Sequence, residues 1–239
     1  MDWGQRALRA GALLCVAGAS SLAAFADSAS TPSAPSAPAE RILKVDFAGQ
    51  ASSSDVRRVA EWAAESGDVQ GKPFAVVDKK QAQIYVFDAS GHLVGTSPTL
   101  LGLAKGDDST PGVASKVSTG IPLAERTTPA GRFESQPGHN IKGEAIVWVD
   151  YSAAVAIHRL RPAPAVERRP QRLASANPDD RRISLGCIVV APEFYDTVVA
   201  PTLGTQHGIV YVLPESAGAD IVLNGTSFGT NRQTLLTRS

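Results

Sequence analysis

Cysteine is scarce in this chain, with two residues in 239, Cys15 and Cys187. Cys15 lies in an N-terminal stretch of small and apolar residues that the mature protein is expected to lose. A chain that keeps one cysteine cannot form an intramolecular disulfide. The thiol of Cys187 is therefore either a small buried hydrophobe or a group that is present for its chemistry.

The sequence also lacks a hydrophobic run long enough for a convincing membrane span. The run Ala10–Ala24 is short, follows a positively charged start, and ends at Ala24-Phe25-Ala26, which fits the small-x-small rule for cleavage. We therefore expect a signal peptide over residues 1–26, export to the periplasm or cell envelope, and no stable membrane span after cleavage. Residues 27–41, rich in Ser, Ala and Pro, predict a solvated tether.

Neither sign of charge dominates, because 23 Lys and Arg face 23 Asp and Glu. Removing residues 1–26, with Asp2, Arg6 and Arg9, leaves 21 basic and 22 acidic side chains and a formal charge of −1. Such a balance predicts no nucleic-acid partner. The 213 residues that remain suit one domain with a sizeable core.

Motifs for metal, phosphate and serine chemistry are absent. There is no HExxH, CxxC or Gly-x-Ser-x-Gly motif, and Gly102–Gly106 does not match a phosphate-binding loop. The acidic pairs Asp107-Asp108 and Asp179-Asp180 fit turns better than a cation site. The four histidines are scattered, at His92, His139, His158 and His207. The sequence thus predicts no metal site and no cofactor.

The hydrophobic pattern predicts a mainly β fold. One helix is expected at Ser54–Ser66, in a lead-in over residues 42–71, because its apolar residues share one helical face. A hairpin is expected around the turn Asp88–Gly91, and a short helix after Pro192. Further apolar runs in this β-like part are Ala145–Val149, Ala153–Ile157, Cys187–Val190, Ile209–Leu213 and Asp220–Leu223. We expect a mainly antiparallel β-sandwich or barrel with a few short helices.

A histidine upstream of the thiol makes nucleophilic chemistry a candidate. His158 ends an apolar run and Gly186 directly precedes Cys187, and a Cys–His pair is a common way to make a sulfur nucleophile. His139 is a rival for the base. The structural alternative, a buried thiol and an unrelated histidine, stays open at this point.

These residues resemble a known family. The spaced motif Ile157-His158 with Ser184-x-Gly186-Cys187-Ile188 resembles the active-site signature of the L,D-transpeptidase (YkuD-type) catalytic domain. The remaining elements that resemble this family are Phe74–Asp78 with Gln83–Phe87, Thr128-Pro129-Ala130-Gly131-Arg132-Phe133, and Gly204-Thr205 leading to Gly208–Val212. The match spans about residues 72–213, with residues 214–239 as a C-terminal extension.

The resemblance implies a reaction and roles for the residues. Cys187 would be the nucleophile, His158 the general base and acid, Gly186 a backbone oxyanion donor, and Ser184 a supporting hydrogen-bonder. The thiol would attack a peptidoglycan stem peptide at the bond between diaminopimelate and D-Ala, and the thioester would pass to an amine, giving a 3-3 cross-link. No metal or cofactor is implied, and carbapenem-type inhibitors are expected partners.

Two positions depart from the family pattern. Leu185 stands where a polar residue, often histidine, is usual, and Val189 stands where Asn or Arg is usual. The 28 residues between His158 and Cys187 also exceed the usual spacing. The surplus lies in Arg159–Arg182, a predicted surface loop with seven arginines, so Arg159 and Arg182 are candidates for binding substrate carboxylates. A solvated loop without a binding role is the alternative.

Two other functions fit the same residues. Transfer of the acyl group to water would make the protein an L,D-carboxypeptidase. The departures at Leu185 and Val189 would instead suit a non-catalytic cell-wall-binding domain. A sortase is disfavoured because Gly186, rather than Thr, precedes the cysteine and no Arg follows closely.

Overall fold

The structure is a computed structural model that describes residues 43–216 and 218–223. The chain divides into two units, 1–39 and 40–239, and every described residue belongs to the second. The predicted signal peptide and the whole predicted tether therefore lie outside the described residues, as does most of the C-terminal extension.

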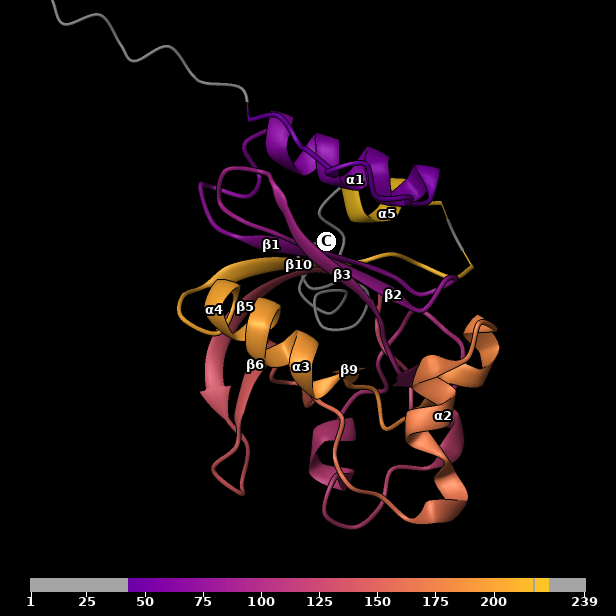
Figure 1. The fold of residues 1–239 in the computed structure, drawn as a ribbon. Coiled ribbons are helices and arrows are strands. Elements are labelled where there is room, and N and C mark those ends of the chain that lie inside the picture. Colours follow the sequence, from indigo (N-terminus) through magenta and orange to yellow (C-terminus); the bar gives the residue numbers. More distant parts are fainter. Residues whose placement is uncertain (1–42, 217, 224–239) are drawn as a thin grey trace, which may run out of the picture. The chain divides into compact units, whose positions relative to one another are not determined.

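Eight strands of the described part form one mixed sheet in the order β3-β2-β1-β10-β5-β6-β7-β9 (Figure 1). The neighbours β1–β10 and β7–β9 are parallel, and the other neighbours are antiparallel. The strands are β1 (Phe74–Asp78), β2 (Gln83–Phe87), β3 (Leu93–Pro98), β5 (Gly131–His139), β6 (Ala145–Asp150), β7 (Val155–Arg159), β9 (Ile188–Val190) and β10 (Gly208–Val212). The prediction of a mainly β fold is confirmed.

The two edges of this sheet are linked. Leu100, just beyond β3, exchanges backbone hydrogen bonds of 2.8 and 2.9 Å with Val189 of the opposite edge strand β9. The sheet is thereby bent into a nearly closed barrel, whose inner core contains Ile84 from β2 and Ile188 from β9. A separate parallel pair, β4 (Leu101–Gly102) with β8 (Arg182–Ser184), follows next to this closure.

Strands β1, β2 and β10 are buried on both faces, which explains their nearly continuous apolar sequences. One face contributes to the inner core and the other to a second core under helix α1 (Ser54–Glu65). The Ser53 side chain caps this helix by accepting from the Val56 N–H at 3.3 Å, as expected from the sequence.

The last described element corrects a strand prediction. Asp220–Leu223, grouped with the apolar runs of the β part, forms the short helix α5 beside α1 (Figure 1). Both edges of the sheet are already occupied by the Leu100–Val189 link, and Ala219 and Val222 instead join the core under α1. The local sequence contains no information about that occupied edge.

The helix expected after Pro192 runs through residues 192–202 in three consecutive segments, and its middle segment is a π-helix. It packs into the inner core through Tyr195 and Val199. These segments are α3 (Pro192–Phe194), η5 (Tyr195–Val199) and α4 (Ala200–Thr202). The remaining short helices are η1 (Val113–Lys116), η2 (Leu123–Glu125), η3 (Ala165–Glu167), α2 (Arg169–Ala174) and η4 (Pro178–Arg181).

Candidate active site

Of the two predicted reactive residues, His158 lies on β7, and Cys187 directly precedes the parallel neighbouring strand β9. His158 of β7 is paired in register with Val189 of β9, and Ile157 with Ile188. Since side chains alternate between faces, Cys187 and Val189 share the face of His158, whereas Ile157 and Ile188 enter the inner core. The strand prediction Ala153–Ile157 is shifted, because residues 151–154 form a turn and His158 lies within the strand.

The imidazole of His158 is oriented by a backbone carbonyl. Its Nδ1 lies 2.7 Å from the Arg159 carbonyl oxygen, which can only accept, so Nδ1 carries the hydrogen and Nε2 is the acceptor. Burial, and secondly the positive charge of Arg161, lower the pKa of His158 to about 4. The imidazole is therefore neutral at pH 7 and able to take a proton.

Cys187 directly precedes β9 and is partly exposed. Its thiol donates to the Ala154 carbonyl at 3.5 Å, and Ala154 presents that oxygen from a turn with φ +56°. Burial raises the pKa of the Cys187 thiol, although the backbone N–H of Ala156 and the charge of Arg161 oppose this shift. The resting nucleophile is thus a neutral thiol.

A tight turn carries the thiol. Gly186 has φ +131°, and a Cβ there would lie 2.9 Å from the Thr127 carbonyl oxygen, so the turn needs glycine. The hydroxyl of Ser184 donates to the Cys187 carbonyl at 2.6 Å and accepts from the Gly186 N–H at 3.1 Å. This differs from the role predicted for Gly186, because its N–H is already donated to Ser184 rather than presented to an oxyanion.

Thr128 supports this turn from outside, in a role that was not predicted from the sequence. Its buried hydroxyl donates to the Gly186 carbonyl at 2.9 Å and accepts from the Gly102 N–H at 2.8 Å. The sequence did single out this residue, since Thr128 opens the Thr-Pro-Ala-Gly element that resembles the family. Its role could not be read because the partner lies 58 positions away.

The two arginines predicted to bind substrate are engaged elsewhere. Arg159 points to the face opposite His158, where it forms an ion pair with Asp196 and stacks over the Tyr195 ring at 4.1 Å. Arg182 is buried and forms an ion pair with Glu215. Their positions do not support the predicted substrate contacts, because each guanidinium is already paired with a carboxylate of the protein.

The other arginines of this segment are mostly structural as well. Arg181 donates to backbone carbonyls of Gln81 and Ala82 at 3.1 Å each, which fastens the segment to the turn after β1. Arg172 donates to backbone carbonyls of its own segment. Arg161 is different: it is half-buried, forms an ion pair of 2.6 Å with Glu144, and acts electrostatically on both His158 and Cys187.

The two departures from the family pattern have different environments. The side chain of Leu185 is exposed, whereas Val189 is fully buried and closes the sheet against Leu100. Leu173 of α2 packs against Val189, so part of the arginine-rich segment covers the outer face of β9. Position 189 is therefore a core position in this chain, which fits an apolar residue.

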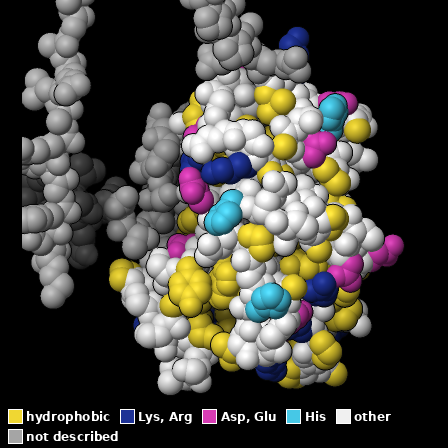
Figure 2. Space-filling view, turned by 90° about the vertical axis from the view of Figure 1, so that its left-hand side faces the viewer, with side chains coloured by type: hydrophobic (Ala, Val, Ile, Leu, Met, Phe, Trp, Pro, Cys, Tyr) yellow, Lys and Arg dark blue, Asp and Glu magenta, His cyan; other side chains and the backbone are white. Residues whose placement is uncertain are grey.

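Other features of the described part offer no competing chemistry. The rival base His139 lies at the exposed end of β5, two strands away from β7 in the sheet order. No group of three or more metal-ligating side chains is found among the described residues. On the face shown in Figure 2, acidic and basic side chains are interspersed rather than gathered into a patch of one sign.

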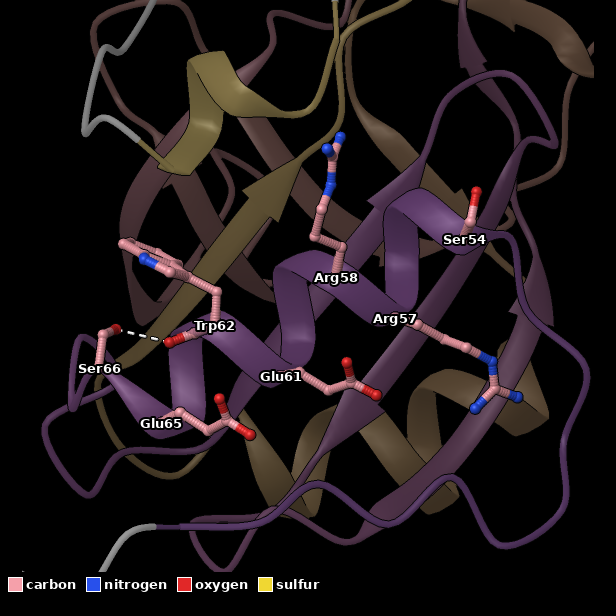
Figure 3. A pocket seen from close by; sticks show the side chains of 7 residues that line it. All are labelled: Ser54, Arg57, Arg58, Glu61, Trp62, Glu65 and Ser66. Carbon is pink, nitrogen blue, oxygen red and sulfur yellow. Dashed lines mark hydrogen bonds between the residues drawn. The ribbon is translucent and has the colours of Figure 1, made fainter.

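A hollow along helix α1 is lined by residues without a thiol or an imidazole (Figure 3). Its lining comes entirely from the outer side of this helix and its C-cap: Ser54, Arg57, Arg58, Glu61, Trp62, Glu65 and Ser66. Within residues 43–216 and 218–223, none of the helices is both long and apolar enough to cross a bilayer. The Cys187–His158 pair remains the candidate site.

Comparison with known proteins finds similarity at the level of structure. No protein-family model matches the chain, and no curated protein matches it in sequence. Similar solved structures include an L,D-transpeptidase from Mycobacterium smegmatis, with 16% identity and a TM-score of 0.36 over 59% of this chain and 58% of that chain. The helical cell shape determining protein Pgp2 from Campylobacter jejuni has 15% identity and a TM-score of 0.39 over 68% and 58%.

A third similar structure is the catalytic domain of an L,D-transpeptidase from E. faecium, with 17% identity and a TM-score of 0.32 over 60% of this chain and 98% of that domain. The chain spans less than two thirds of the length of the first two proteins. Several of the similar structures are therefore L,D-transpeptidases, the family that the sequence motifs resemble. With TM-scores below 0.5, these similarities carry no argument about the activity of this chain.

Proposed function

We propose that this protein is an exported cysteine acyltransferase acting on peptidoglycan stem peptides, an L,D-transpeptidase that forms 3-3 cross-links. One observation carries the proposal: Cys187, directly before β9, lies on the same face of the sheet as His158 of the parallel neighbour β7, with the imidazole held so that Nε2 can accept a proton. The motifs around both residues support the substrate class, and the expected signal peptide supports export.

The first half-reaction would begin from a neutral thiol and a neutral imidazole. His158 Nε2 takes the thiol proton as Cys187 Sγ attacks the carbonyl carbon between diaminopimelate and D-Ala. Collapse of the tetrahedral intermediate breaks the C–N bond, and His158 returns the proton to the departing D-Ala amine. A thioester on Cys187 remains.

The oxyanion needs backbone N–H donors, each worth about 3–4 kcal/mol in such sites. Because Ser184 holds the Gly186 N–H, the remaining candidates in this turn are the amides of Leu185 and Cys187. In the second half-reaction His158 takes a proton from an acceptor amine, which attacks the thioester. An amide forms, and the thiol leaves with the proton.

Arg161 replaces Arg159 and Arg182 as the proposed substrate-binding arginine. It lies within electrostatic reach of both reactive residues, and stem peptides carry carboxylates that a guanidinium binds well. Arg161→Gln should raise KM about tenfold with a smaller change in kcat. Arg168→Gln is the matched control, because Arg168 is an exposed arginine of the same segment. An unchanged KM for Arg161→Gln in a steady-state assay would exclude this contact.

The proposal is tested by intact-mass spectrometry of the mature protein after exposure to imipenem. We expect a covalent adduct on the wild type and none on Cys187→Ala. His158→Gln should form the adduct at least a hundredfold more slowly, because general-base catalysis contributes about 10²–10⁴-fold. A folded wild type without any adduct would favour the non-catalytic cell-wall-binding alternative. Product analysis with a tetrapeptide donor then separates transfer to an amine from transfer to water.

A further inference from the structure

Two ion pairs, which together carry no net charge, lie behind the turn 184–187; three of their four side chains are buried and the fourth, Glu215, is 12% exposed. Lys79, with no exposed surface, donates its three hydrogens to the Asp107 carboxylate at 2.8 Å and to the carbonyls of Gly106 at 2.5 Å and Thr128 at 2.9 Å. Arg182 forms the second ion pair, with Glu215, and also donates to the Lys79 carbonyl at 2.6 Å. We call these four residues, Lys79, Asp107, Arg182 and Glu215, the buried charge cluster.

Hydrogen bonds connect the cluster to the segment after β10. The Asp107 carboxylate accepts from the backbone N–H groups of Glu215 at 2.7 Å and Ser216 at 3.0 Å. Burial favours the neutral acid, but hydrogen bonds from Lys79, Ser216 and the backbone outweigh it and lower the pKa of Asp107 to about 2. Burying charged groups costs desolvation free energy, which offsets much of their mutual attraction. A gain in stability is therefore a weak explanation for a cluster at this place.

Two chains of contacts lead from the cluster to the nucleophile. In the first, Lys79 holds the Thr128 carbonyl, and the Thr128 hydroxyl holds the Gly186 carbonyl. In the second, Arg182 opens strand β8, which ends at Ser184, and the Ser184 hydroxyl holds the Cys187 carbonyl. Both chains end on the turn 184–187, one on each side of the thiol.

We propose that the buried charge cluster positions the nucleophile, with Lys79 and Thr128 as positioning residues that keep the Cys187 thiol against the Ala154 carbonyl, on the sheet face of His158. This proposal deepens the proposed function and rests on it for its catalytic meaning. None of the four charged groups touches the reacting atoms, so each acts through the turn 184–187.

The test measures the pH dependence of Cys187 alkylation by iodoacetamide, a reaction of the thiolate that needs no acyl-transfer activity. Thr128→Val removes the hydroxyl while keeping the shape, and Lys79→Met removes the charge. In both variants a loosened turn lets the thiol reach water, so the midpoint of the profile should move to lower pH, towards the ordinary thiol value of about 8.5. The maximal rate of acylation by imipenem should fall about tenfold or more, because a small misplacement of the reacting atoms greatly lowers the reaction rate.

Two controls isolate the positioning role. Thr128→Ser keeps the hydroxyl and should restore the wild-type midpoint. Thr96→Val removes a hydroxyl that likewise donates to a backbone carbonyl, Ile84 at 2.9 Å, and accepts one hydrogen bond, but lies on β3. Its midpoint should match that of the wild type. Circular dichroism establishes which variants are folded. If Lys79→Met does not fold, the Thr128 variants alone test the positioning role.

The outcomes separate this inference from the proposed function. Equal midpoints in the wild type and folded Thr128→Val would overturn the positioning role, even if imipenem acylates the wild type. A shifted midpoint in Thr128→Val, restored in Thr128→Ser, would support it. That result would stand without any imipenem adduct, in which case the acyltransferase proposal alone would fail.

Discussion

At the scale of single residues, the local environment of the thiol and the imidazole keeps both neutral at pH 7. Burial is the leading cause for each: it disfavours the thiolate of Cys187 and the imidazolium of His158. A preformed thiolate–imidazolium pair is therefore not the resting state. In the proposed reaction, proton transfer from the thiol to the imidazole would therefore accompany the attack.

The raised thiol pKa predicts the behaviour of Cys187 towards iodoacetamide. Since the thiolate is the reacting species, the alkylation rate of the folded chain without residues 1–26, and so without Cys15, should keep rising through pH 8 and reach half its maximum above about 8.5. The same chain in guanidinium chloride serves as the control with an ordinary thiol. A native midpoint below that of the unfolded chain would indicate a stabilised thiolate and contradict this description.

The lowered His158 pKa predicts a pH-dependent stability. The imidazole of His158 has a pKa of 6.5 in the unfolded chain and of about 4 in the folded chain. Between these values the unfolded state binds more protons, so the free energy of unfolding falls as the pH decreases from 6.5 towards 4. The gap corresponds to a loss of about 3 kcal/mol when complete. Urea unfolding at pH 7.0, 5.5 and 4.5 should show this decrease in the wild type.

The same titration of His158→Gln should show a much smaller decrease over this range. Asp107 does not interfere with this comparison. Because its pKa is lowered to about 2, its contribution to the free energy of unfolding is complete above about pH 4 and is lost only between about pH 4 and 2. Parallel stability curves for the two proteins would rule out a buried neutral imidazole.

At the scale of elements, the turn between β8 and β9 decides whether the thiol is presented at all. Gly186→Ala should strongly reduce imipenem acylation and lower the free energy of unfolding by about 2 kcal/mol or more. The added methyl group both strains a backbone at φ +131° and meets the Thr127 carbonyl oxygen at 2.9 Å. Acylation kinetics and urea unfolding measure the two effects.

Gly143→Ala is the matched control for this turn. Gly143 also has a positive φ, +77°, but a Cβ there would meet nothing within 4 Å. It should show a loss of about 1 kcal/mol from strain alone and an unchanged rate of acylation. Equal effects of the two substitutions would mean that the close approach to Thr127 is unimportant.

At the scale of the whole molecule, the link between the sheet edges makes Val189 a core residue. Val189→Asn, which introduces a residue usual in the family pattern, should lower the free energy of unfolding by about 2–3 kcal/mol, because it buries an amide between Leu100 and Leu173. Thermal or urea unfolding provides the measurement.

Leu185→His, at the other departure, should change stability by less than about 0.5 kcal/mol, because Leu185 is 41% exposed. An equally small change in stability for Val189→Asn would contradict the burial of Val189 at the closure of the sheet. The pair therefore distinguishes a departure forced by packing from one at the surface of the site.

Local sequence patterns predicted much of the fold. The capped helix after Ser53, the hairpin around Asp88–Gly91 and the helix after Pro192 depend on neighbouring residues, and each is present. The strand β5 was missed, because its exposed positions are polar and it contains Pro137 and Gly138. The helix α5 was grouped with β-like runs, because three consecutive apolar residues after Asp220 do not distinguish a strand from a helix.

By itself, the sequence determined which groups this protein has for chemistry: the thiol of Cys187, a histidine upstream of it, and a glycine that permits a tight turn. Tertiary structure alone decided what those groups and their neighbours do. It paired β7 with β9, turned Arg159 away from the site, and buried Lys79 and Asp107 behind it. The physical reason is range: capping and periodicity act within a few residues, whereas strand pairing and charge burial join positions far apart in the chain, which no local pattern encodes.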